Sequence, residues 1–189
     1  MAADFTIRPY RPRRDTPAIL RLIRRELAPL SRKPIGREAL TDRALAERIR
    51  RGRTLVAVGR GGKVKGFVHI LVVEQPDAPA RLMVDLLAVE PASRGRGIGS
   101  ALLREAEAYG RRIKCQAASL FVDEGNDRAH RFYLHAGYHT VRYWPQLRCW
   151  ELHKPLSPPD DFPPGAKWSA WSEPTAAFHA IVLRRKLSR

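Results

Sequence analysis

The sequence is short of cysteine, of long apolar runs and of lysine, and these shortages narrow the classes of protein to which it can belong. Its 189 residues contain only Cys115 and Cys149, with no C-x-x-C pair, so neither a disulfide framework nor a zinc knuckle is expected. No apolar run approaches the roughly 20 residues that cross a bilayer, so no membrane partner is expected. The first residues include Asp4 and Arg8 and lack an apolar signal core, which predicts a cytoplasmic protein.

Arginine supplies most of a strong positive charge. The chain holds 35 Lys and Arg against 19 Asp and Glu, a net charge of +16, and only seven of the cations are lysine. The excess is +10 in residues 1–60 and +3 in each of the segments 61–120 and 121–189. Arginine binds phosphate and carboxylate in a bidentate manner, so one interpretation is a surface that faces nucleic acid, a ribosome or an anionic cofactor. The other is a solvated surface that reflects genome composition; no aromatic residues are interleaved with the basic stretch, so a dedicated nucleic-acid module is not supported.

Composition and periodicity predict one mixed α/β domain over residues 1–189. The chain is 44% hydrophobic and 29% charged, values typical of folded proteins, and it is long enough to bury a core. Thr16-Pro17 predicts a helix start with Thr16 as the cap, and Gly52 is expected to close a second helix. Pro76 and Pro79 predict a break over residues 75–80. Further helices are expected after residues 97 and 126, and strands over 5–10, 54–58, 64–73, 82–89, 120–122 and 139–143.

The last quarter of the sequence leaves two arrangements open. Residues 177–185 read as a final strand, which makes the proline- and tryptophan-rich stretch at about 144–176 an insertion. If residues 148–153 close the sheet instead, residues 155–189 form a C-terminal extension. We expect Trp150, Trp168 and Trp171 to pack as a lid or wall over the entrance of a binding site, or to form a subunit interface of a homodimer.

A glycine- and arginine-rich loop lies between an apolar strand and an amphipathic helix. Its sequence, Arg94-Gly95-Arg96-Gly97-Ile98-Gly99, allows the backbone to approach a ligand, and the amides at a helix start favour a phosphate. Ser100 stands where the dinucleotide motif G-x-G-x-x-G has its third glycine, and no G-K-[ST] follows as in a P-loop. The loop alone is equally compatible with a structural turn.

Three motifs in order resemble the GCN5-related N-acetyltransferase (GNAT) superfamily. They are Leu87-Ala88-Val89-Glu90-Pro91, then Arg94-x-x-Gly97-x-Gly99, then Asn126-x-x-Ala129-x-x-Phe132-Tyr133-x-x-x-Gly137-Tyr138. The opening Ile7-Arg8-Pro9-Tyr10 is also similar to the start of many members, so the resemblance covers residues 5 to about 143 and a final strand. It implies a central, mostly antiparallel sheet with a splayed parallel pair, flanked by about four helices.

The resemblance also implies acetyl-CoA as the cosubstrate and assigns residues to it. Asn126 would contact the pantetheine arm, and Tyr133 would lie beside the thioester sulfur and protonate the departing thiolate. The alternative for Tyr133 is a core aromatic, because it shares a helical stripe with Ala129 and Phe132. The arm would pair with the strand residues Leu87, Ala88 and Val89, and the pyrophosphate would lie on Arg94, Gly95, Arg96, Gly97, Ile98, Gly99 and Ser100.

The chemistry needs a base more than it needs a nucleophile. In this superfamily an amine attacks the thioester directly, and removing the proton from an amine of pKa about 10.4 at neutral pH costs on the order of 4.6 kcal/mol. Asp85, which interrupts an apolar strand, is the candidate base; the alternative is a strand carboxylate paired with an arginine. His69 is the second candidate, and a water chain the third. The glutamate base of the branch that acetylates ribosomal-protein N-termini is replaced here by Phe121, so that branch's mechanism does not carry over.

These observations predict an enzyme, an N-acetyltransferase that moves acetyl from acetyl-CoA to a primary amine of a protein, a peptide or a small molecule. The alternative is a basic protein that binds CoA or nucleic acid without turnover. No metal is expected: His135 and His139 are four residues apart, but Gly137 ends the helix between them, so they would not share one face as a zinc pair must.

Overall fold

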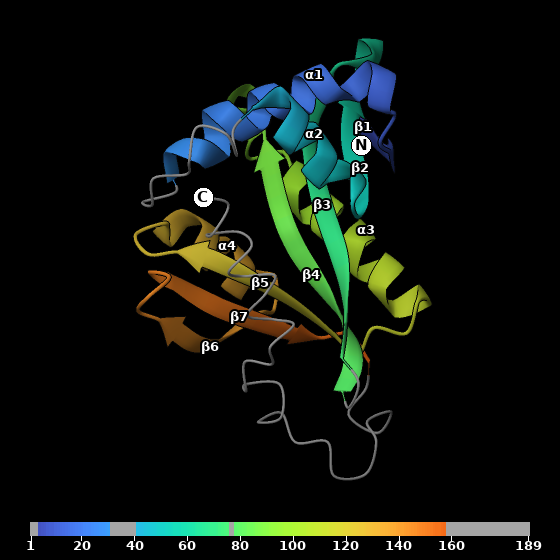
Figure 1. Cartoon of the computed structure of the whole chain (residues 1–189). Helices are drawn as coiled ribbons and strands as arrows, with labels where there is room; N and C mark the ends of the chain where they lie inside the picture. Colours follow the sequence, from blue (N-terminus) through green and yellow to red (C-terminus); the bar gives the residue numbers. More distant parts are fainter. Residues whose placement is uncertain (1–3, 31–40, 76–77, 158–189) are drawn as a thin grey trace. The chain divides into compact units, whose positions relative to one another are not determined.

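The computed structural model describes residues 4–30, 41–75 and 78–157. These residues form a seven-stranded mixed sheet with strand order β1-β2-β3-β4-β5-β7-β6, in which β4 and β5 are parallel. Four α-helices accompany the sheet in this part of the chain (Figure 1). The predicted mixed α/β class with one parallel pair is confirmed.

The chain divides into two compact units, which are described here one at a time. Unit 1 comprises residues 1–71 and 84–106, and unit 2 comprises residues 72–83 and 107–189. The division passes through three elements: β3 (Val64–Gln75), β4 (Ala78–Val89) and α3 (Ile98–Arg112). Residues of both units therefore belong to continuous strands and to one continuous helix.

In unit 1, antiparallel strands and two amphipathic helices enclose an apolar core. Strand β1 (Phe5–Pro9) pairs with β2 (Arg53–Gly59), and β2 pairs with β3. Helix α1 (Pro12–Leu22) continues into η1 (Ile23–Leu27) and η2 (Ala28–Leu30), and α2 (Asp42–Arg50) follows. Both helices turn their apolar stripes toward one cluster, which includes Ile19, Ile23, Leu45, Ile49, Val56 and Phe67.

Helix α1 begins five residues before the predicted start, at Pro12 instead of Pro17. Its first residue is Pro12, whose fixed φ and missing N–H suit that position, and the Asp15 carboxylate accepts the Arg11 amide at 2.7 Å. Thr16 therefore lies inside the helix, where its hydroxyl donates to the Pro12 carbonyl. The sequence offered two prolines as helix starts, and the carboxylate of Asp15, fixed by Arg8 at 2.7 Å, favours the first.

Helix α2 has the expected apolar residues, but Gly52 does not end it in the predicted way. Thr41 caps the start of the helix by accepting the Ala44 amide at 3.3 Å. Gly52 has no left-handed φ; it is needed for space, because a Cβ there would lie 2.2 Å from the Ile70 carbonyl oxygen. The glycine serves the approach of this segment to β3 and not the helix terminus.

The sequence Arg60-Gly61-Gly62-Lys63 predicts a turn between the strands expected over 54–58 and 64–73, and this turn is confirmed between β2 and β3. Gly61 and Gly62 turn the chain with φ values of 80° and 79°. The predicted break before β4 is shorter than expected. Strand β4 starts at Ala78, so Pro79 is its second residue and lies at the end of the strand instead of in a break.

Unit 2 contains the antiparallel strands β5 (Ala117–Asp123), β7 (Cys149–Pro155) and β6 (His139–Trp144), with helix α4 (Asp127–His135). Asn126 caps α4 by accepting the Ala129 amide at 3.2 Å, and Gly137 follows the helix with φ of 87°. The helix predicted after residue 126 and its predicted end at Gly137 are therefore confirmed, whereas the capping role of Asn126 was not predicted. Gly110 of α3 also belongs to this unit, and a Cβ there would lie 2.8 Å from Leu156.

One of the two predicted closing strands lies in the described part of the chain. Strand β7 covers residues 149–155, close to the predicted 148–153, and pairs with both β5 and β6. The other candidate, residues 177–185, lies outside the described residues, as do Trp168 and Trp171. Trp150 lies on β7 within 4.7 Å of the Tyr143 ring and 5.8 Å of the His130 ring, measured between centroids.

Candidate active site

The glycine-rich loop of unit 1 joins β4 to the N-terminus of α3. After β4, Pro91–Ser93 form the short helix η5, and Gly95 and Gly97 both adopt φ of 75°. A Cβ built on either glycine would meet no atom within 4 Å, so the loop faces open space. The first amide to enter the α3 hydrogen-bond ladder belongs to Ala101, which donates to Gly97 at 2.9 Å. Among the described residues, the amides of residues 95–100 donate to no backbone carbonyl, and such an array suits an anion.

Arg94 is engaged differently from the other loop residues. Its amide donates to the Pro91 carbonyl at 3.2 Å, and its Nε donates to the Val89 carbonyl at 3.2 Å. Its terminal nitrogen is hydrogen-bonded to the Glu26 carboxylate. The arginine of the motif therefore holds the loop to β4 and η1, and the open amides begin at Gly95.

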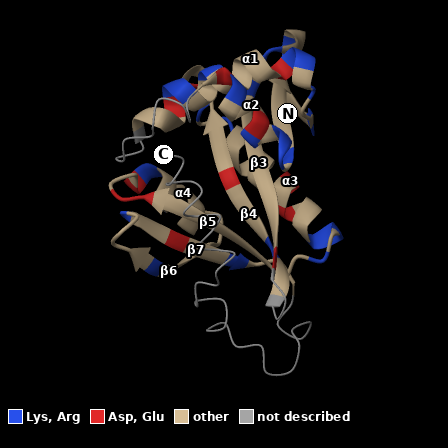
Figure 2. Cartoon of the chain, viewed as in Figure 1, with Lys and Arg blue, Asp and Glu red and all other residues tan. Residues whose placement is uncertain are grey.

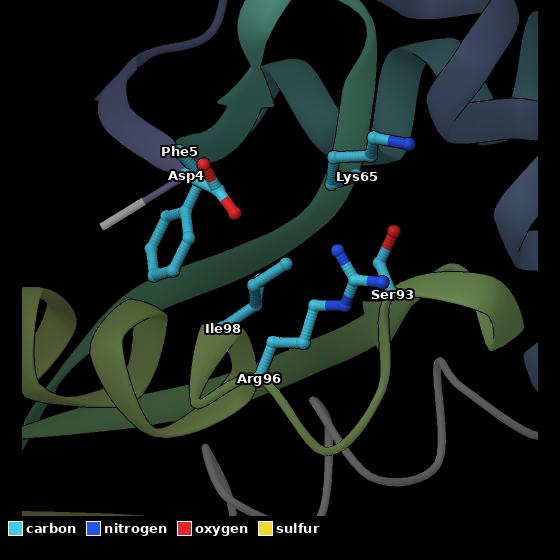
Figure 3. A pocket seen from close by; sticks show the side chains of 6 residues that line it. All are labelled: Asp4, Phe5, Lys65, Ser93, Arg96 and Ile98. Carbon is cyan, nitrogen blue, oxygen red and sulfur yellow. The ribbon is translucent and has the colours of Figure 1, made fainter. Parts of the chain in front are cut away.

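A cavity of about 300 Å³ lies beside this loop within unit 1 (Figure 3). Lys65 and Arg96 bring positive charge to its wall, and Asp4 brings negative charge. Lys65 is paired with Glu90 at 3.1 Å, and this hydrogen bond is the main reason that the pKa of Glu90 is lowered. The remaining lining residues are Phe5, Ser93 and Ile98.

The strand segment assigned to the pantetheine arm lies at the end of β4. Ala88 is buried in the core of unit 1, whereas Leu87 and Val89 are half-buried. Gly66 of β3 lies against this segment, since a Cβ there would be 2.8 Å from the Ala88 carbonyl oxygen. The backbone of this segment is thus closely covered on the β3 side.

Asp85 of β4 is buried and bound by an arginine. Its two carboxylate oxygens accept from Nε and a terminal nitrogen of Arg48 at 2.9 and 3.0 Å. Burial acts to lower the pKa of Arg48, but the charge and hydrogen bonds of Asp85 outweigh it and raise that pKa. The Asp85 side chain is 3% exposed and that of Arg48 is 36% exposed, so the arginine reaches the carboxylate from the surface. This is the ion pair that the sequence left open as the alternative to a base.

His69 of β3, the second candidate base, is buried next to Asp85. The Thr54 hydroxyl donates to the Ile49 carbonyl at 3.1 Å and lies 3.0 Å from His69 Nδ1. Because the hydroxyl proton is used on Ile49, His69 Nδ1 acts as the donor to Thr54. His69 Nε2 then lies 3.8 Å from an Asp85 oxygen, which places a second titratable group beside the carboxylate.

Unit 2 carries the two site residues of α4. The Asn126 side-chain oxygen caps the helix, so a ligand would meet its amide nitrogen. The Tyr133 ring is 8% exposed and makes edge contacts with Phe132 and Tyr138, with centroids 5.0 and 5.6 Å apart. These contacts give Tyr133 the packing of a core aromatic and hold its ring in one orientation.

Sequence reasoning missed a buried polar cluster on β7. Glu151 is 2% exposed and accepts from His153 Nε2 at 2.7 Å and from Trp144 Nε1 at 2.9 Å. Arg81 of β4 is also 2% exposed; burial lowers its pKa and the charge of Glu151 opposes that shift. The strand register places Glu151 opposite Phe121, the position at which one branch of the superfamily has its glutamate. The sequence pattern that could have revealed this cluster is the alternation of Cys149, Glu151 and His153 on one face of a strand. Polar residues in such an alternation are equally typical of a strand face exposed to solvent, so the pattern does not indicate burial.

Other chemistries find less support in the described part of the chain. No three His, Cys, Asp or Glu side chains there are grouped as a metal site would require. Burial, with a smaller contribution from Glu74, raises the pKa of the Cys115 thiol to about 11, which disfavours a nucleophilic thiolate. No helix among these residues is long and apolar enough to span a membrane.

Comparisons with known proteins agree with the motifs. A model of the acetyltransferase (GNAT) family matches residues 19–138. A mycothiol acetyltransferase from Propionibacterium freudenreichii is 34% identical over 87 residues, covering 46% of this chain and 28% of that protein. The chain thus matches little more than a quarter of the length of that relative. A tRNA-acetylating toxin from Mycobacterium tuberculosis is 31% identical over 122 residues, covering 56% of this chain and 72% of the toxin.

Solved structures share the fold. A PaiA N-acetyltransferase from Thermoplasma acidophilum in complex with coenzyme A superposes with a TM-score of 0.68 and 18% identity. The superposition covers 82% of this chain and 99% of that one. At this level of identity the likeness concerns the fold alone.

Proposed function

Because this chain belongs to the acetyltransferase (GNAT) family, we propose that it transfers an acetyl group from acetyl-CoA to a primary amine by direct attack. The observation that carries this proposal is the loop at the start of α3, where two left-handed glycines and a row of open amides face unfilled space. A pyrophosphate matches both the amides and the positive end of the helix dipole.

The residues proposed to bind the cofactor are those that the family motifs assign to it. In unit 1, the amides of Gly95 to Ser100 would bind the pyrophosphate, with Arg96 as a nearby cation and the Ser100 hydroxyl as a further donor. The end of β4, Leu87 to Val89, would pair with the pantetheine arm. In unit 2, Asn126 would contact the arm and Tyr133 the thioester sulfur. Arg94 would act by holding the loop, because its own donors are engaged with Pro91, Val89 and Glu26.

The reaction forms a C–N bond and breaks a C–S bond. The amine lone pair attacks the thioester carbonyl, the amine loses one proton to a base, and the departing thiolate takes a proton from the Tyr133 hydroxyl. The thiol, with a pKa of about 8.5, is a tolerable leaving group, so the base carries the heavier demand. Asp85 is the proposed base, with His69 or a water chain as the alternatives. For Asp85 to accept a proton, the half-exposed Arg48 must give up at least one of its two hydrogen bonds.

The first experiment tests the cofactor site with two glycine variants of matched strain. Gly97→Glu puts a side chain and a negative charge into the loop, whereas Gly61→Glu does the same in the β2–β3 turn. Both glycines have φ near 80° and no neighbour within 4 Å of a Cβ, so the backbone strain is comparable. We expect Gly97→Glu to weaken CoA binding by about two orders of magnitude or more in calorimetry, and Gly61→Glu to leave it unchanged. Equal CoA affinity in the two folded variants would refute the assignment of the loop.

The second experiment tests turnover and the acceptor class. Release of the CoA thiol from acetyl-CoA would be followed with peptides, polyamines, aminoglycosides, amino acids and aminoacyl-tRNA. The printed names of the relatives include mycothiol and tRNA, which differ widely in size, so both small and large acceptors belong in the panel. CoA binding without thiol release for any acceptor would favour the alternative, a basic protein that binds CoA without turnover.

A further inference from the structure

The outer surface of the α1–α2 layer in unit 1 is lined by exposed arginines. Blue segments mark these helices in Figure 2, with few red ones between them. Both helices bury their apolar stripes in the same core, so their opposite sides face outward. The exposed arginines of α1, η1, α2 and the adjoining residues are Arg11, Arg13, Arg14, Arg21, Arg24, Arg25, Arg43, Arg50, Arg51 and Arg53.

The few acidic residues in this layer already have arginine partners. Asp42 forms an ion pair with Arg24, which also ties the two helices together. Glu47 pairs with Arg51 at 2.8 Å. Glu26 pairs with Arg94 of the glycine-rich loop and lies 3.6 Å from Arg25. The charges of Arg43 and Arg50 also act on Glu47 without an ion-pair contact. The three carboxylates are nevertheless far fewer than the exposed arginines of this layer.

Six arginines of this surface have no carboxylate within 4 Å among the described residues; they are Arg11, Arg13, Arg14, Arg21, Arg43 and Arg50. We call them the arginine face. Arg14 and Arg21 are seven residues apart on α1, and Arg43 and Arg50 are seven apart on α2. Seven residues are nearly two helical turns, about 10.5 Å, so each pair lies along one side of its helix.

Other exposed helical surfaces of the described chain carry a smaller positive excess. In residues 11–30 and 41–53, ten arginines are exposed against two acidic residues, Asp42 and Glu47. On α3 and α4, the exposed arginines are Arg104, Arg111, Arg112, Arg128 and Arg131, against Glu105 and Asp127. The larger excess on the α1–α2 layer suits a polyanionic partner.

We propose that the arginine face docks the phosphate backbone of a structured RNA. Arginine forks bind phosphate oxygens in a bidentate manner, and a row of unpaired guanidinium groups can follow successive phosphates. Helices α1, η1 and α2 contain no aromatic residue, so the face lacks an aromatic platform for stacking unpaired bases and would read RNA mainly by its backbone and shape.

An anionic membrane fits this face less well. Surface binding to lipid needs large apolar side chains beside the cations. The large exposed apolar residues of the described chain are Val72, Ile113 and Leu134, and none of them lies on α1, η1 or α2. An acidic protein remains as the rival partner, and the experiment below includes it.

We further propose that the docked RNA carries the primary amine that is acetylated; this part rests on the proposed function. A primary amine on a large polyanion would then be chosen through contacts distant from the reacting nitrogen. Such contacts lower KM for the RNA-borne acceptor without changing the reaction of a small amine.

The test compares two variants of equal net charge in the full chain. One replaces Arg14, Arg21, Arg43 and Arg50 by Gln, and the control replaces the exposed Arg104, Arg111, Arg128 and Arg131 by Gln. Binding to unfractionated tRNA is measured by fluorescence anisotropy at several salt concentrations, without CoA. Each lost phosphate contact should reduce the slope of log K against log salt by about 0.7 to 0.9, so the first variant should lose roughly 3 from the slope. At 100 mM salt we expect its affinity to fall at least about tenfold, and that of the control to change less than about twofold.

Several outcomes would overturn the proposal. An equal loss in the control variant would mean that total charge, and not this face, drives binding. Displacement of tRNA by an equal charge concentration of poly-glutamate would favour an acidic protein, and equal binding to anionic vesicles would favour a membrane. Loss of tRNA binding by the unaltered chain at 100 mM salt would also refute it. Melting temperature and CoA affinity of both variants should equal those of the unaltered chain, which excludes misfolding as the cause.

Thiol release separates this proposal from the proposed function. With aminoacyl-tRNA as acceptor, the arginine-face variant should show a KM at least about tenfold higher, and with a small amine the KM should be unchanged. If none of the tested acceptors supports thiol release, the proposed function is refuted, while the tRNA binding result still stands. If small amines are acetylated but the arginine-face variant binds tRNA as well as the unaltered chain, the RNA-docking proposal is refuted and the proposed function stands.

Discussion

Asp85 and Glu151 are carboxylates buried in β-strands, one in each compact unit, and different groups hold them. Asp85 is bound by Arg48, whose side chain is 36% exposed and enters from the last turn of α2. Glu151 is bound by His153 and Trp144, and its nearby cation, Arg81, is itself buried. The charge that compensates Asp85 can be withdrawn toward solvent, whereas that of Glu151 cannot. A charged residue in an apolar strand is thus the same signal in the sequence for two kinds of carboxylate: one whose compensating cation is partly exposed and can move away, and one whose compensating cation is buried and cannot.

The largest expected effect comes from breaking the fixed cluster. Glu151→Ala removes the acceptor of two buried hydrogen bonds and leaves Arg81 without its compensating charge. We expect the free energy of unfolding to fall by about 3–5 kcal/mol, the usual cost of removing one partner of a buried pair. Urea unfolding of this variant measures the loss. Glu105→Ala, on an exposed side of α3, is the control and should change stability by less than about 0.5 kcal/mol. A loss below 1 kcal/mol in Glu151→Ala would show that the cluster is not structural.

Two neighbouring tyrosines of unit 2 allow a second comparison, between a proposed proton donor, Tyr133, and a structural residue, Tyr138. Tyr133→Phe keeps the ring packing and removes the proposed proton donor, so turnover should fall about 10²-fold or more at unchanged CoA affinity. Tyr138→Phe is the matched control, because its ring lies 5.6 Å from Tyr133. Burial, with Glu107 and Tyr133, raises the pKa of Tyr138 well above its ordinary value, so it stays a neutral structural group. Steady-state kinetics decide the roles, and equal turnover in the two variants would return Tyr133 to the core.

A smaller effect is expected from releasing Asp85. A neighbouring cation favours the ionised carboxylate, so in Arg48→Met the rise of kcat/KM with pH should move to higher pH. Activity at the acidic end would then fall severalfold. Asp85→Asn should flatten the rise altogether, because it removes the titrating group. If the pH profile is unaltered in both variants and only the melting temperature falls, then Asp85 is a salt-bridge partner and not the base.

The smallest effect is expected for a carboxylate held near the surface. The pKa of Glu90 is lowered, mainly by its hydrogen bond from Lys65 and further by Lys63. Since the folded-state value lies below the unfolded one, the stabilisation is complete above about pH 4.3 and is lost as pH falls through the lower folded-state value. Lys65→Met should cost less than about 1 kcal/mol at pH 7, and that difference should shrink toward zero near pH 3. A difference that is the same at both pH values would assign the loss to packing of the lysine stem.

Sequence patterns predicted local features well because local rules decide them. The helix after residue 126, the left-handed Gly137 and the turn at Gly61 each depend on residues within a few positions of one another. The predicted start of α1 was wrong because Pro12 and Pro17 are equally good local signals for a helix start. A contact with Arg8, seven residues before Asp15, favours the earlier one.

The candidate site shows the same limit. The motifs alone predicted a loop whose backbone opens toward an anion, and the φ values of Gly95 and Gly97 agree with it. The motif did not reveal that Arg94 is held by Glu26, 68 residues away in sequence, or that Arg48 occupies both oxygens of Asp85. Such partners are brought together by the packing of helices on strands, which no spacing in the sequence encodes.

The sequence by itself determined the order of the elements, the glycine turn and the family, because periodicity, backbone conformation and motif spacing are properties of neighbouring residues. Only the tertiary structure decided which carboxylates are buried and which charges compensate them. The stripe of Glu151 and His153 illustrates the reason: alternation in a strand defines two faces, but it does not say which face other parts of the chain will cover.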